Sequence, residues 1–340
     1  MLLLLLSLVE LARCQATTPL SLAPQQADLG SFDLANSLPP PAYSVHATTL
    51  AQLPPECAAV TPSTTLPSDI GNFSASCSAE MTALSVTLED CDTPYIICRC
   101  ADAEMAMDAL VDRLARVPVG LRRYAGTVIA LAATVPGPSA VTMSGASGGA
   151  SATFCFGDCT MNVWIHEMTH ALDMADPGSA GWQSSAIGWS NALAADTCVP
   201  DTYSQTNAIE DFAQVSVLLI YKLLNGGLPP GFYEDCMKHQ LAYLSAMTPY
   251  NDSSLLFGND CSIGPLATHS SPPDVLDPTR QFNSSGEGAA PDPPSKALGS
   301  GACRPATSTT MVLFLQLGGN CLLVSNINKL HLDIRSTLDK

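Results

Sequence analysis

The stretch WIHEMTHALD, residues 164–173, decides the interpretation of this sequence. His166, Glu167 and His170 form the pattern H-E-x-x-H, and the apolar letters around them predict a helix held in a core. Positions i and i+4 lie on one helical face, so both imidazoles can bind one Zn²⁺. Glu167 then stands beside the ion as the general base for a zinc-activated water. The motif therefore predicts His166 and His170 as metal ligands and Glu167 as a catalytic residue.

A catalytic zinc site needs a third protein ligand and an open position. Glu210 is the first choice, because it lies in YSQTNAIEDFAQ, residues 203–214, a helix-forming stretch downstream of the motif. Glu210 can instead complete a capping box with Asn207 and merely reach back to the start of its helix. Its neighbour Asp211 is a weaker candidate on a different helical face.

Two further carboxylates compete for the same role. Asp176 has the position of the third ligand in the metzincin pattern, although Asp173 stands where that pattern has glycine. Asp201 lies at a distance similar to the third ligand of the aspzincins. Asp173 itself is either an acceptor that orients a ligand imidazole or an exposed helix carboxylate. The donor atoms of the true ligand set should lie within roughly twice a metal–ligand bond of 2.0–2.2 Å from one another.

These motifs resemble known families. H-E-M-T-H-A-L-D followed by Y-x6-E-D-F-A is similar to the gluzincin peptidases related to anthrax lethal factor. That resemblance implies a second catalytic residue, Tyr203, because a Tyr seven residues before the ligand Glu assists at the metal in that family. Residues 91–245 also resemble secreted fungal zincin-like proteins of the conidiation-specific type, through ICRC, LRRY, FGDC, VWIHE and EDFAQ in order. Gln214 departs from the lethal-factor pattern, which has Glu at that place.

The apolar patterns predict an α+β fold. Strands are expected at 95–98, 126–135 and 151–156, and helices at 103–117, from about 161, and at 182–195, 207–224 and 231–247. The resemblance implies a zincin-like metallopeptidase domain with a small mixed sheet. Either 126–135 or 151–156 is expected to offer an edge to an extended peptide by strand addition.

Composition and charge limit the partners and the compartment. The 340 residues contain 14 Lys plus Arg against 31 Asp plus Glu, a formal charge of −17, which excludes nucleic-acid binding. The apolar segment MLLLLLSLV at the start predicts a signal peptide over 1–16. Three N-x-S sequons, at Asn72, Asn251 and Asn283, permit glycosylation. We therefore expect a secreted glycoprotein, extracellular or in the cell wall.

The cysteines predict a disulfide framework. Of 13 cysteines, twelve remain after removal of Cys14 with the signal peptide, enough for up to six disulfides. We expect at least one of Cys155 and Cys159 to be bonded, because they precede the motif helix and can anchor it. Cys198 is expected to pair with a cysteine outside its own loop, which carries Tyr203.

Changes in composition suggest the domain organisation. A Pro/Ser/Thr-rich arm or propeptide is expected at 17–75, a catalytic domain at 76–250, and a Ser/Pro-rich tail with a short apolar segment at 251–340. No transmembrane helix is expected. The predicted function is a secreted zinc metallopeptidase, an endopeptidase that acts on a peptide or protein substrate. The alternative is a catalytically weak or inactive zincin-fold protein of the spore or cell surface.

Overall fold

A computed structural model of the chain describes residues 18–38, 45–60, 63–68, 71–134, 137–143, 151–175, 182–259, 261, 313–317 and 320–324. The expected signal peptide at 1–16 and most of the expected tail lie outside the described residues. The chain divides into two units, Met1–Gln281 and Phe282–Lys340, and the candidate site belongs to the first.

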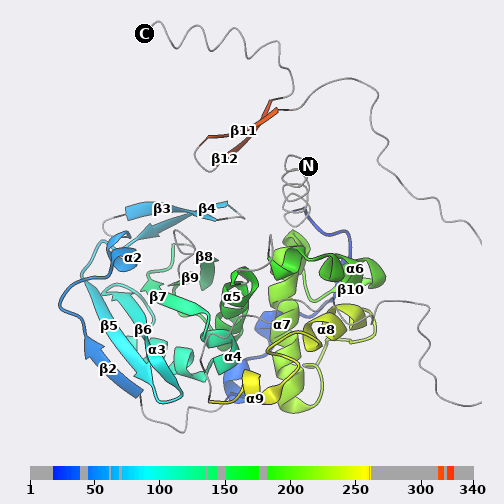
Figure 1. Ribbon diagram of the computed structural model, residues 1–340, viewed down its shortest axis with the longest axis horizontal. Coiled ribbons are helices and arrows are strands. Elements are labelled where there is room, and N and C mark those ends of the chain that lie inside the picture. Colours follow the sequence, from blue (N-terminus) through cyan, green and yellow to red (C-terminus); the bar gives the residue numbers. More distant parts are fainter. Residues whose placement is uncertain are drawn as a thin grey trace, which may run out of the picture. The chain divides into compact units, whose positions relative to one another are not determined.

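The first unit is built on a six-stranded mixed sheet in the order β2-β5-β6-β7-β9-β8 (Figure 1). Strands β6, β7 and β9 run parallel, whereas β2 with β5, β5 with β6, and β8 with β9 are antiparallel. The bounds are β2 Val45–Thr49, β5 Met81–Leu88, β6 Cys91–Cys100, β7 Ala125–Leu131, β8 Ser139–Met143 and β9 Ser151–Phe156. The predicted α+β class with a small mixed sheet is confirmed.

The edge of this sheet is not where the sequence predicted it. Strand β7 lies between β6 and β9, and β9 lies between β7 and β8, so neither is an edge. The edge beside the motif helix is β8. The runs at 126–135 and 151–156 are apolar because interior strands are buried on both faces, and that signal should have argued against an edge.

The longer helices lie on one face of the sheet, with α5 between β8 and α7 (Figure 1), whereas the short α2 packs on the other face through Cys57. Helix α7 ends at Asn225, and the following Gly226, with a φ of 78°, lets the chain leave in the left-handed region. The helices are α2 Pro55–Ala58, α3 Met107–Arg116, α4 Val119–Arg122, α5 Met161–Met174, α6 Ile187–Ala195, α7 Ala208–Asn225, α8 Lys238–Ser245 and α9 Ser253–Leu256. Short 3₁₀ turns are η1 Leu29–Ser31, η2 Leu34–Asn36, η4 Gln183–Ser185 and η5 Ser204–Thr206.

Both faces of the sheet are buried, because successive side chains point to opposite faces and each face is covered by its own core. Ile97 and Val128 join the large core shared with the helices, whereas Cys98 and Ile129 belong to a smaller core on the opposite face. The hairpin of β3 Ser63–Ser68 and β4 Gly71–Ser76 forms a separate two-stranded sheet. This arrangement fixes the sheet as the base on which α5 rests.

Five disulfides join segments of the first unit. The pairs are Cys57–Cys98, Cys77–Cys100, Cys91–Cys261, Cys155–Cys159 and Cys198–Cys236. The expected anchoring of Cys155 or Cys159 and the pairing of Cys198 outside its loop are therefore confirmed. A sixth pair would involve Cys303, which lies outside the described residues.

The expected boundary at residue 75 does not separate an arm from the domain. Leu29, Leu34 and Leu38 are buried in the large core, and β1 Ala23–Pro24 pairs in parallel with β10 Cys198–Val199. Strand β2 is part of the six-stranded sheet. Residues 18–38, which we call the strap, run irregularly over the helical side of the first unit. Their buried leucines therefore show neither helical nor strand periodicity in the sequence.

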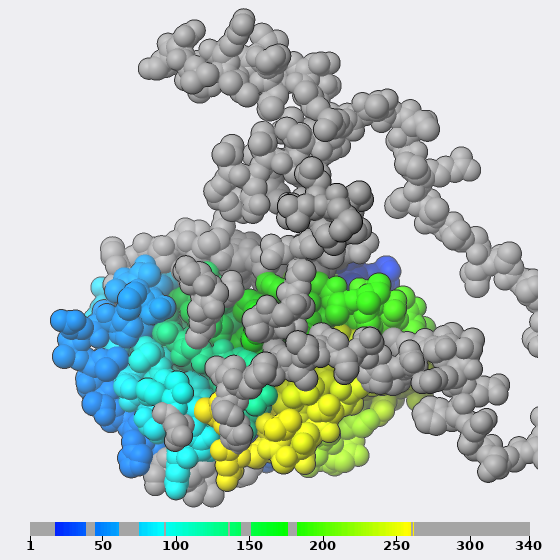
Figure 2. All heavy atoms as spheres, in the orientation of Figure 1, coloured from blue at the N-terminus to red at the C-terminus, as the bar shows by residue number. Residues whose placement is uncertain are grey.

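The boundary at residue 250 is also too early. Helix α9 follows it, and Cys261 is bonded to Cys91 in the sheet. In Figure 2 the yellow atoms near the end of this segment lie against the cyan atoms of the sheet. The second unit contains an antiparallel hairpin, β11 Leu313–Leu317 and β12 Asn320–Val324, within the expected apolar segment. Among the described residues, no helix has the length and apolar character to cross a membrane.

Candidate metal centre

Helix α5 brings the two motif histidines together in the core. The Nε2 atoms of His166 and His170 are 3.0 Å apart, and the rings meet edge to face with centroids 4.6 Å apart. Both residues are less than one-tenth exposed. The spacing of four residues thus places both imidazoles on one face, as the sequence predicted.

Glu210, near the start of α7, faces the same point. Its Oε2 lies 3.1 Å from Nε2 of His166 and 3.4 Å from Nε2 of His170. The helix start is capped by Asn207, whose Oδ1 accepts from the backbone N–H groups of Ile209 and Glu210. The Asn207 cap and the contact with the histidines therefore coexist, because the Glu210 side chain is directed at the imidazoles.

The three donor atoms fit a small, borderline-soft cation. Their separations of 3.0, 3.1 and 3.4 Å fall inside the expected limit of roughly two metal–ligand bonds. They approach the edge of about 3.4 Å of a tetrahedron with bonds of 2.0–2.2 Å. Two imidazoles and one carboxylate also match a donor set that catalytic zinc takes. His166, His170 and Glu210 are accordingly a group that could hold a metal ion.

The charges at this point are strongly coupled. Burial alone would disfavour the charged imidazolium, but the Glu210 carboxylate raises the pKa of His170 to about 9. Burial would likewise raise the pKa of Glu210, yet the two histidines hold it well below its usual range. Glu210 is therefore a carboxylate here, as a metal ligand must be.

Glu167 is buried beside the ligand group, and its Oε2 has no hydrogen-bond partner in the described part of the chain. Burial raises its pKa, against the opposing charges of His166 and His170 and a hydrogen bond from Thr142. The Thr142 hydroxyl, on the edge strand β8, also lies 3.1 Å from the backbone carbonyl oxygen of Glu167. The site thus contains two carboxyl groups with opposite pKa shifts: the pKa of Glu167 is raised and that of Glu210 is lowered.

Tyr203 lies at the open side of the group. Its ring centroid is 5.8 Å from that of His166, and 46% of the residue is exposed. Desolvation, followed by the charges of Glu210 and Glu167, raises the pKa of its hydroxyl. Tyr203 is therefore a neutral hydrogen-bond donor that solvent can reach.

The rival ligands are placed elsewhere or lie outside the described residues. Asp201 accepts from Ser204 and from the Gln214 side chain, and it is not one of the grouped donors. Asp211 is fully buried with both oxygens unpartnered among the described residues, and burial raises its pKa. Asp176 lies outside the described residues.

Asp173 was expected to orient an imidazole or to be exposed, and the exposed alternative is wrong. The residue is fully buried, and its carboxylate accepts from the backbone N–H of Ser184 at 2.7 Å and from the Ser184 hydroxyl at 2.6 Å. Burial raises the pKa of Asp173 to about 6, against these hydrogen bonds and the charge of His170. Asp173 thus attaches the η4 turn to α5.

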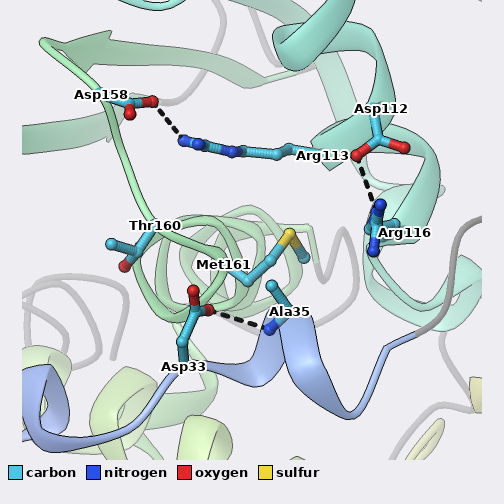
Figure 3. Close-up of a pocket in the computed structure, with 8 residues that line it drawn as sticks. All are labelled: Asp33, Ala35, Asp112, Arg113, Arg116, Asp158, Thr160 and Met161. Carbon is cyan, nitrogen blue, oxygen red and sulfur yellow. Dashed lines mark hydrogen bonds and ion pairs between the residues drawn. The ribbon is translucent and has the colours of Figure 1, made fainter.

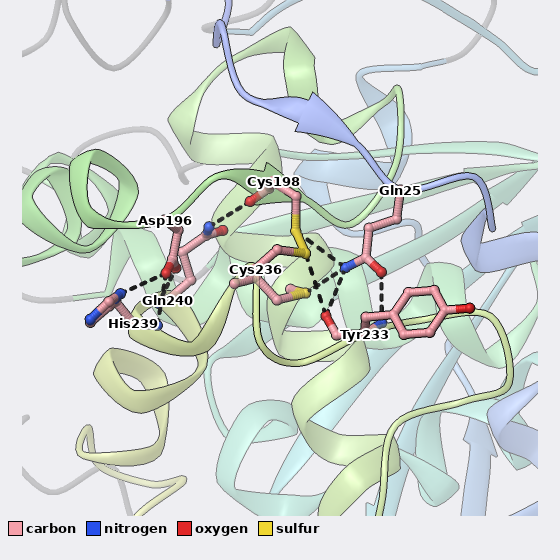
Figure 4. Close-up of a disulfide and its surroundings, with 8 residues drawn as sticks. Gln25, Asp196, Cys198, Tyr233, Cys236, His239 and Gln240 are labelled. Carbon is pink, nitrogen blue, oxygen red and sulfur yellow. Dashed lines mark hydrogen bonds and ion pairs between the residues drawn. A yellow bond between two sulfur atoms is a disulfide. The ribbon is translucent and has the colours of Figure 1, made fainter.

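The loop before α7 is fastened from two sides (Figure 4). The Cys198–Cys236 disulfide joins it to the segment before α8, and Asp196 accepts from His239 Nδ1 at 2.7 Å. On the other side, Gln25 of the strap donates its backbone N–H to the Val199 carbonyl at 3.0 Å, and its Nε2 lies 3.5 Å from Cys198 Sγ. These links hold the loop that delivers Tyr203 and Asp201.

Two other features do not belong to this centre. Cys77, Cys100 and Asp102 lie close together, but the two cysteines are bonded to each other and cannot serve as thiolate ligands. A pocket of about 400 Å³ opens at the start of α5 (Figure 3). Four of its five charged residues pair with one another, Arg113 with Asp158 and Arg116 with Asp112, and the fifth, Asp33, accepts from the backbone N–H of Ala35.

Sequence reasoning missed the surroundings of His166. Its Nδ1 lies 3.0 Å from Gln214 Oε1, and Gln214 Nε2 lies 3.0 Å from Asp201. Gln214 is four residues after Glu210, so helical spacing alone could have placed it on the ligand face. The link to Asp201 carries no local signal.

Comparison with known proteins gives a family. The family described as conidiation-specific protein Con-13 matches residues 56–243, more than half of the chain. Conidiation-specific protein 13 of Neurospora crassa is 33% identical over 146 residues, covering 42% of this chain. The match spans 41% of that relative, well under half of its length. No solved structure matches the chain.

Proposed function

The chain belongs to the Con-13 family, and we propose that it is a secreted zinc-dependent metallopeptidase of the gluzincin type with a zincin-like catalytic domain. One observation carries the proposal. Three donor atoms of His166, His170 and Glu210 lie 3.0–3.4 Å from one another beside Glu167, whose buried Oε2 has no partner among the described residues. A purely structural metal site would not need this fourth group.

Glu167 and Tyr203 have different roles in the proposed reaction. Zinc, when bound, supplies a Lewis acid that lowers the pKa of water and polarises a carbonyl. Glu167 takes the proton of the attacking water and returns it to the leaving amine. Its raised pKa moves its basicity toward neutral pH, where proton transfer in both directions is most effective. Tyr203 donates a hydrogen bond to the developing oxyanion from the exposed side.

The substrate that suits this site is an extended peptide. Strand β8 has a strand partner on one side among the described strands, and its Thr142 contacts Glu167. A peptide that pairs with the free side of β8 would pass beside the ligand group. We therefore assign endopeptidase activity on peptides or proteins, and the charge of −17 gives no support to a nucleic-acid substrate.

We infer secretion from the disulfides. Five pairs tie the first unit together, and such a density persists in an oxidising compartment. The sequon residue Asn251 is exposed, as a glycan acceptor must be.

The alternative is a zincin-fold protein of the spore or cell surface that binds zinc or a partner without cleavage. It is favoured by the name of the Neurospora crassa relative, which refers to conidiation, and by the burial of His166 and His170 to below one-tenth exposure. In that protein Glu167 would have no task.

Digestion of casein and of a peptide library separates these two functions. The proposal expects cleavage by the full chain that a chelator abolishes and added zinc restores. The matched Glu167→Gln variant, with the carboxylate made neutral, should bind zinc without cleaving. If the wild-type chain binds zinc but cleaves neither substrate, and so behaves like Glu167→Gln, the result would favour the alternative.

A further inference from the structure

A buried chain of hydrogen bonds runs from the rear of His166 to the loop before α7. The Nδ1 of His166 lies 3.0 Å from Gln214 Oε1, and the Nε2 of Gln214 lies 3.0 and 3.3 Å from the two carboxylate oxygens of Asp201. All three residues are less than one-tenth exposed. Water cannot easily replace these contacts, so their donor and acceptor roles must match.

Asp201 determines the direction of the chain. Its Oδ1 accepts from the backbone N–H of Ser204 at 3.0 Å, and its Oδ2 accepts from the backbone N–H of Leu29 at 3.5 Å. A backbone N–H can only donate, so both oxygens act as acceptors. The Gln214 amide must therefore turn its NH₂ group toward Asp201, because its carbonyl oxygen would face two acceptors there.

This orientation decides which nitrogen of His166 carries the proton. With the NH₂ group of Gln214 toward Asp201, its Oε1 faces Nδ1 of His166 and can only accept. Nδ1 must then carry the proton, and Nε2 has its lone pair free. That same Nε2 lies 3.0 Å from His170 Nε2 and 3.1 Å from Glu210 Oε2, at the point where the three donors meet.

We propose that Asp201 and Gln214 are positioning residues that fix His166 as the Nδ1–H tautomer and thereby prepare its Nε2 as a metal donor. This inference rests on the metal site of the proposed function, and not on hydrolysis. The helix α7 supplies Glu210 as a ligand and Gln214 one turn later as the support of another ligand. The strap takes part through Leu29, which connects residues 18–38 to the metal centre.

The direct test is long-range ¹H–¹⁵N NMR of histidine-labelled, metal-free full chain, at a pH where His166 is neutral. This spectrum distinguishes Nδ1–H from Nε2–H imidazoles and needs no variant. We expect the Nδ1–H pattern for His166. An Nε2–H pattern would overturn the proposal.

Zinc affinity of variants provides a second test. Gln214→Leu should bind zinc about 10- to 100-fold more weakly, the usual effect of removing a group that orients a ligand, and its His166 should show mixed tautomers. Arg99→Leu is the control, because the Arg99 side chain on β6 donates to the carbonyls of Ala103 and Met105 instead of to His166 or the loop before α7. It should keep the wild-type zinc affinity whatever its stability.

The outcomes separate this inference from the proposed function. Wild-type zinc affinity in Gln214→Leu would overturn the positioning role and leave the peptidase proposal intact. Normal tautomer and affinity results without peptide cleavage would overturn the peptidase proposal and leave the positioning role intact. A wild-type chain that takes up no zinc would reject the metal site, whereas the NMR result would still decide the tautomer.

Discussion

Two carboxylates with opposite environments lie within the candidate centre. Burial raises the pKa of Glu167, whereas the neighbouring histidines hold the pKa of Glu210 below its usual range despite burial. Paired groups whose pKa values are driven apart have different tasks in acid–base chemistry. Glu210 is suited to remain ionised as a ligand, and Glu167 to exchange a proton.

Replacing Glu167 tests this division. Glu167→Ala should retain zinc and the fold but lower the rate of peptide hydrolysis by at least ~10²-fold, because a general base is lost. Zinc content by mass spectrometry and cleavage of a fluorogenic peptide measure the two effects. Under the same conditions His166→Ala should lose the metal, and equal zinc loss in both variants would show that the roles are confused.

Zinc binding should depend on pH through His170. A metal ligand must be a neutral imidazole, and Glu210 raises the pKa of His170 to about 9 in the metal-free chain. A proton must therefore leave below that pH, so apparent zinc affinity should rise about tenfold per pH unit up to pH 9 and then level off. Competition with a chelator at a series of pH values measures this slope, and an affinity that is constant from pH 6 to 9 contradicts it.

In the metal-free chain the same pKa shift has the opposite pH dependence: it makes the fold more stable at low pH, where zinc binding is weakest. A raised folded-state pKa means that the charged His170 contributes stability below its unfolded value of about 6.5. That contribution is lost as the pH rises through about 9. Metal binding and acid stability are thus in competition at this one side chain.

The grouping of His166, His170 and Glu210 could be predicted from sequence, because the information that brings them together is local. The spacing of His166 and His170 follows helical geometry, and Glu210 follows a recognisable helix start. The link from Gln214 to Asp201 could not be predicted, because Asp201 lies in a separate loop before α7. Hydrogen bonds between distant segments leave no periodic signal.

At the scale of elements, the strap is the largest departure from expectation. Residues 18–38 lie against both α5 and the loop before α7. Asn162 of α5 donates to the carbonyls of Leu29 and Phe32, both at 2.6 Å, and accepts from the N–H of Leu34 at 2.8 Å. The strap therefore satisfies a buried amide one turn before His166.

Deleting residues 18–38 should destabilise the chain strongly. Leu29, Leu34 and Leu38 are buried, and each contributes roughly 1.5–3 kcal/mol by burial. Loss of the partners of Asn162 adds roughly 1–3 kcal/mol. Urea unfolding should show a lower midpoint and zinc affinity should fall, whereas a chain lacking only residues 1–16 should behave as the intact chain. Unchanged unfolding after removal of 18–38 would identify this segment as a dispensable propeptide.

The edge strand illustrates a second limit of sequence reasoning. Strand β8 is short and follows two prolines, Pro136 and Pro138, so it has a weak strand signal of its own. Its position became clear only from its pairing with β9. The interior strands β7 and β9 have the stronger apolar runs, so the sequence favours them over the true edge strand.

At the scale of the molecule, one disulfide joins segments of the first unit that are far apart in the sequence. Cys91 and Cys261 are separated by 170 residues, so their bond closes most of the domain. Cys155 and Cys159 are separated by 4. Because disulfide connectivity cannot be read from spacing, the sequence alone could not show that Cys261 is bonded to the sheet.

The two disulfides should differ in their effect on unfolding. By loop-closure entropy the Cys91–Cys261 bond contributes at most about 5 kcal/mol, and the Cys155–Cys159 bond about 2 kcal/mol. The double variant Cys91→Ser with Cys261→Ser should therefore lower the melting temperature more than Cys155→Ser with Cys159→Ser. Calorimetry of both double variants measures this order, and the reverse order would contradict the role assigned to the long closure.

The central claim is that His166, His170 and Glu210 together hold one zinc ion. Native mass spectrometry of the purified full chain, beside its Glu210→Gln variant, tests it most directly, because this substitution removes a charged donor while keeping the side-chain shape. We expect one zinc per wild-type chain and none, or a strongly reduced fraction, in the variant. A wild-type chain without zinc after incubation with the metal, or a variant with the full complement, would contradict it.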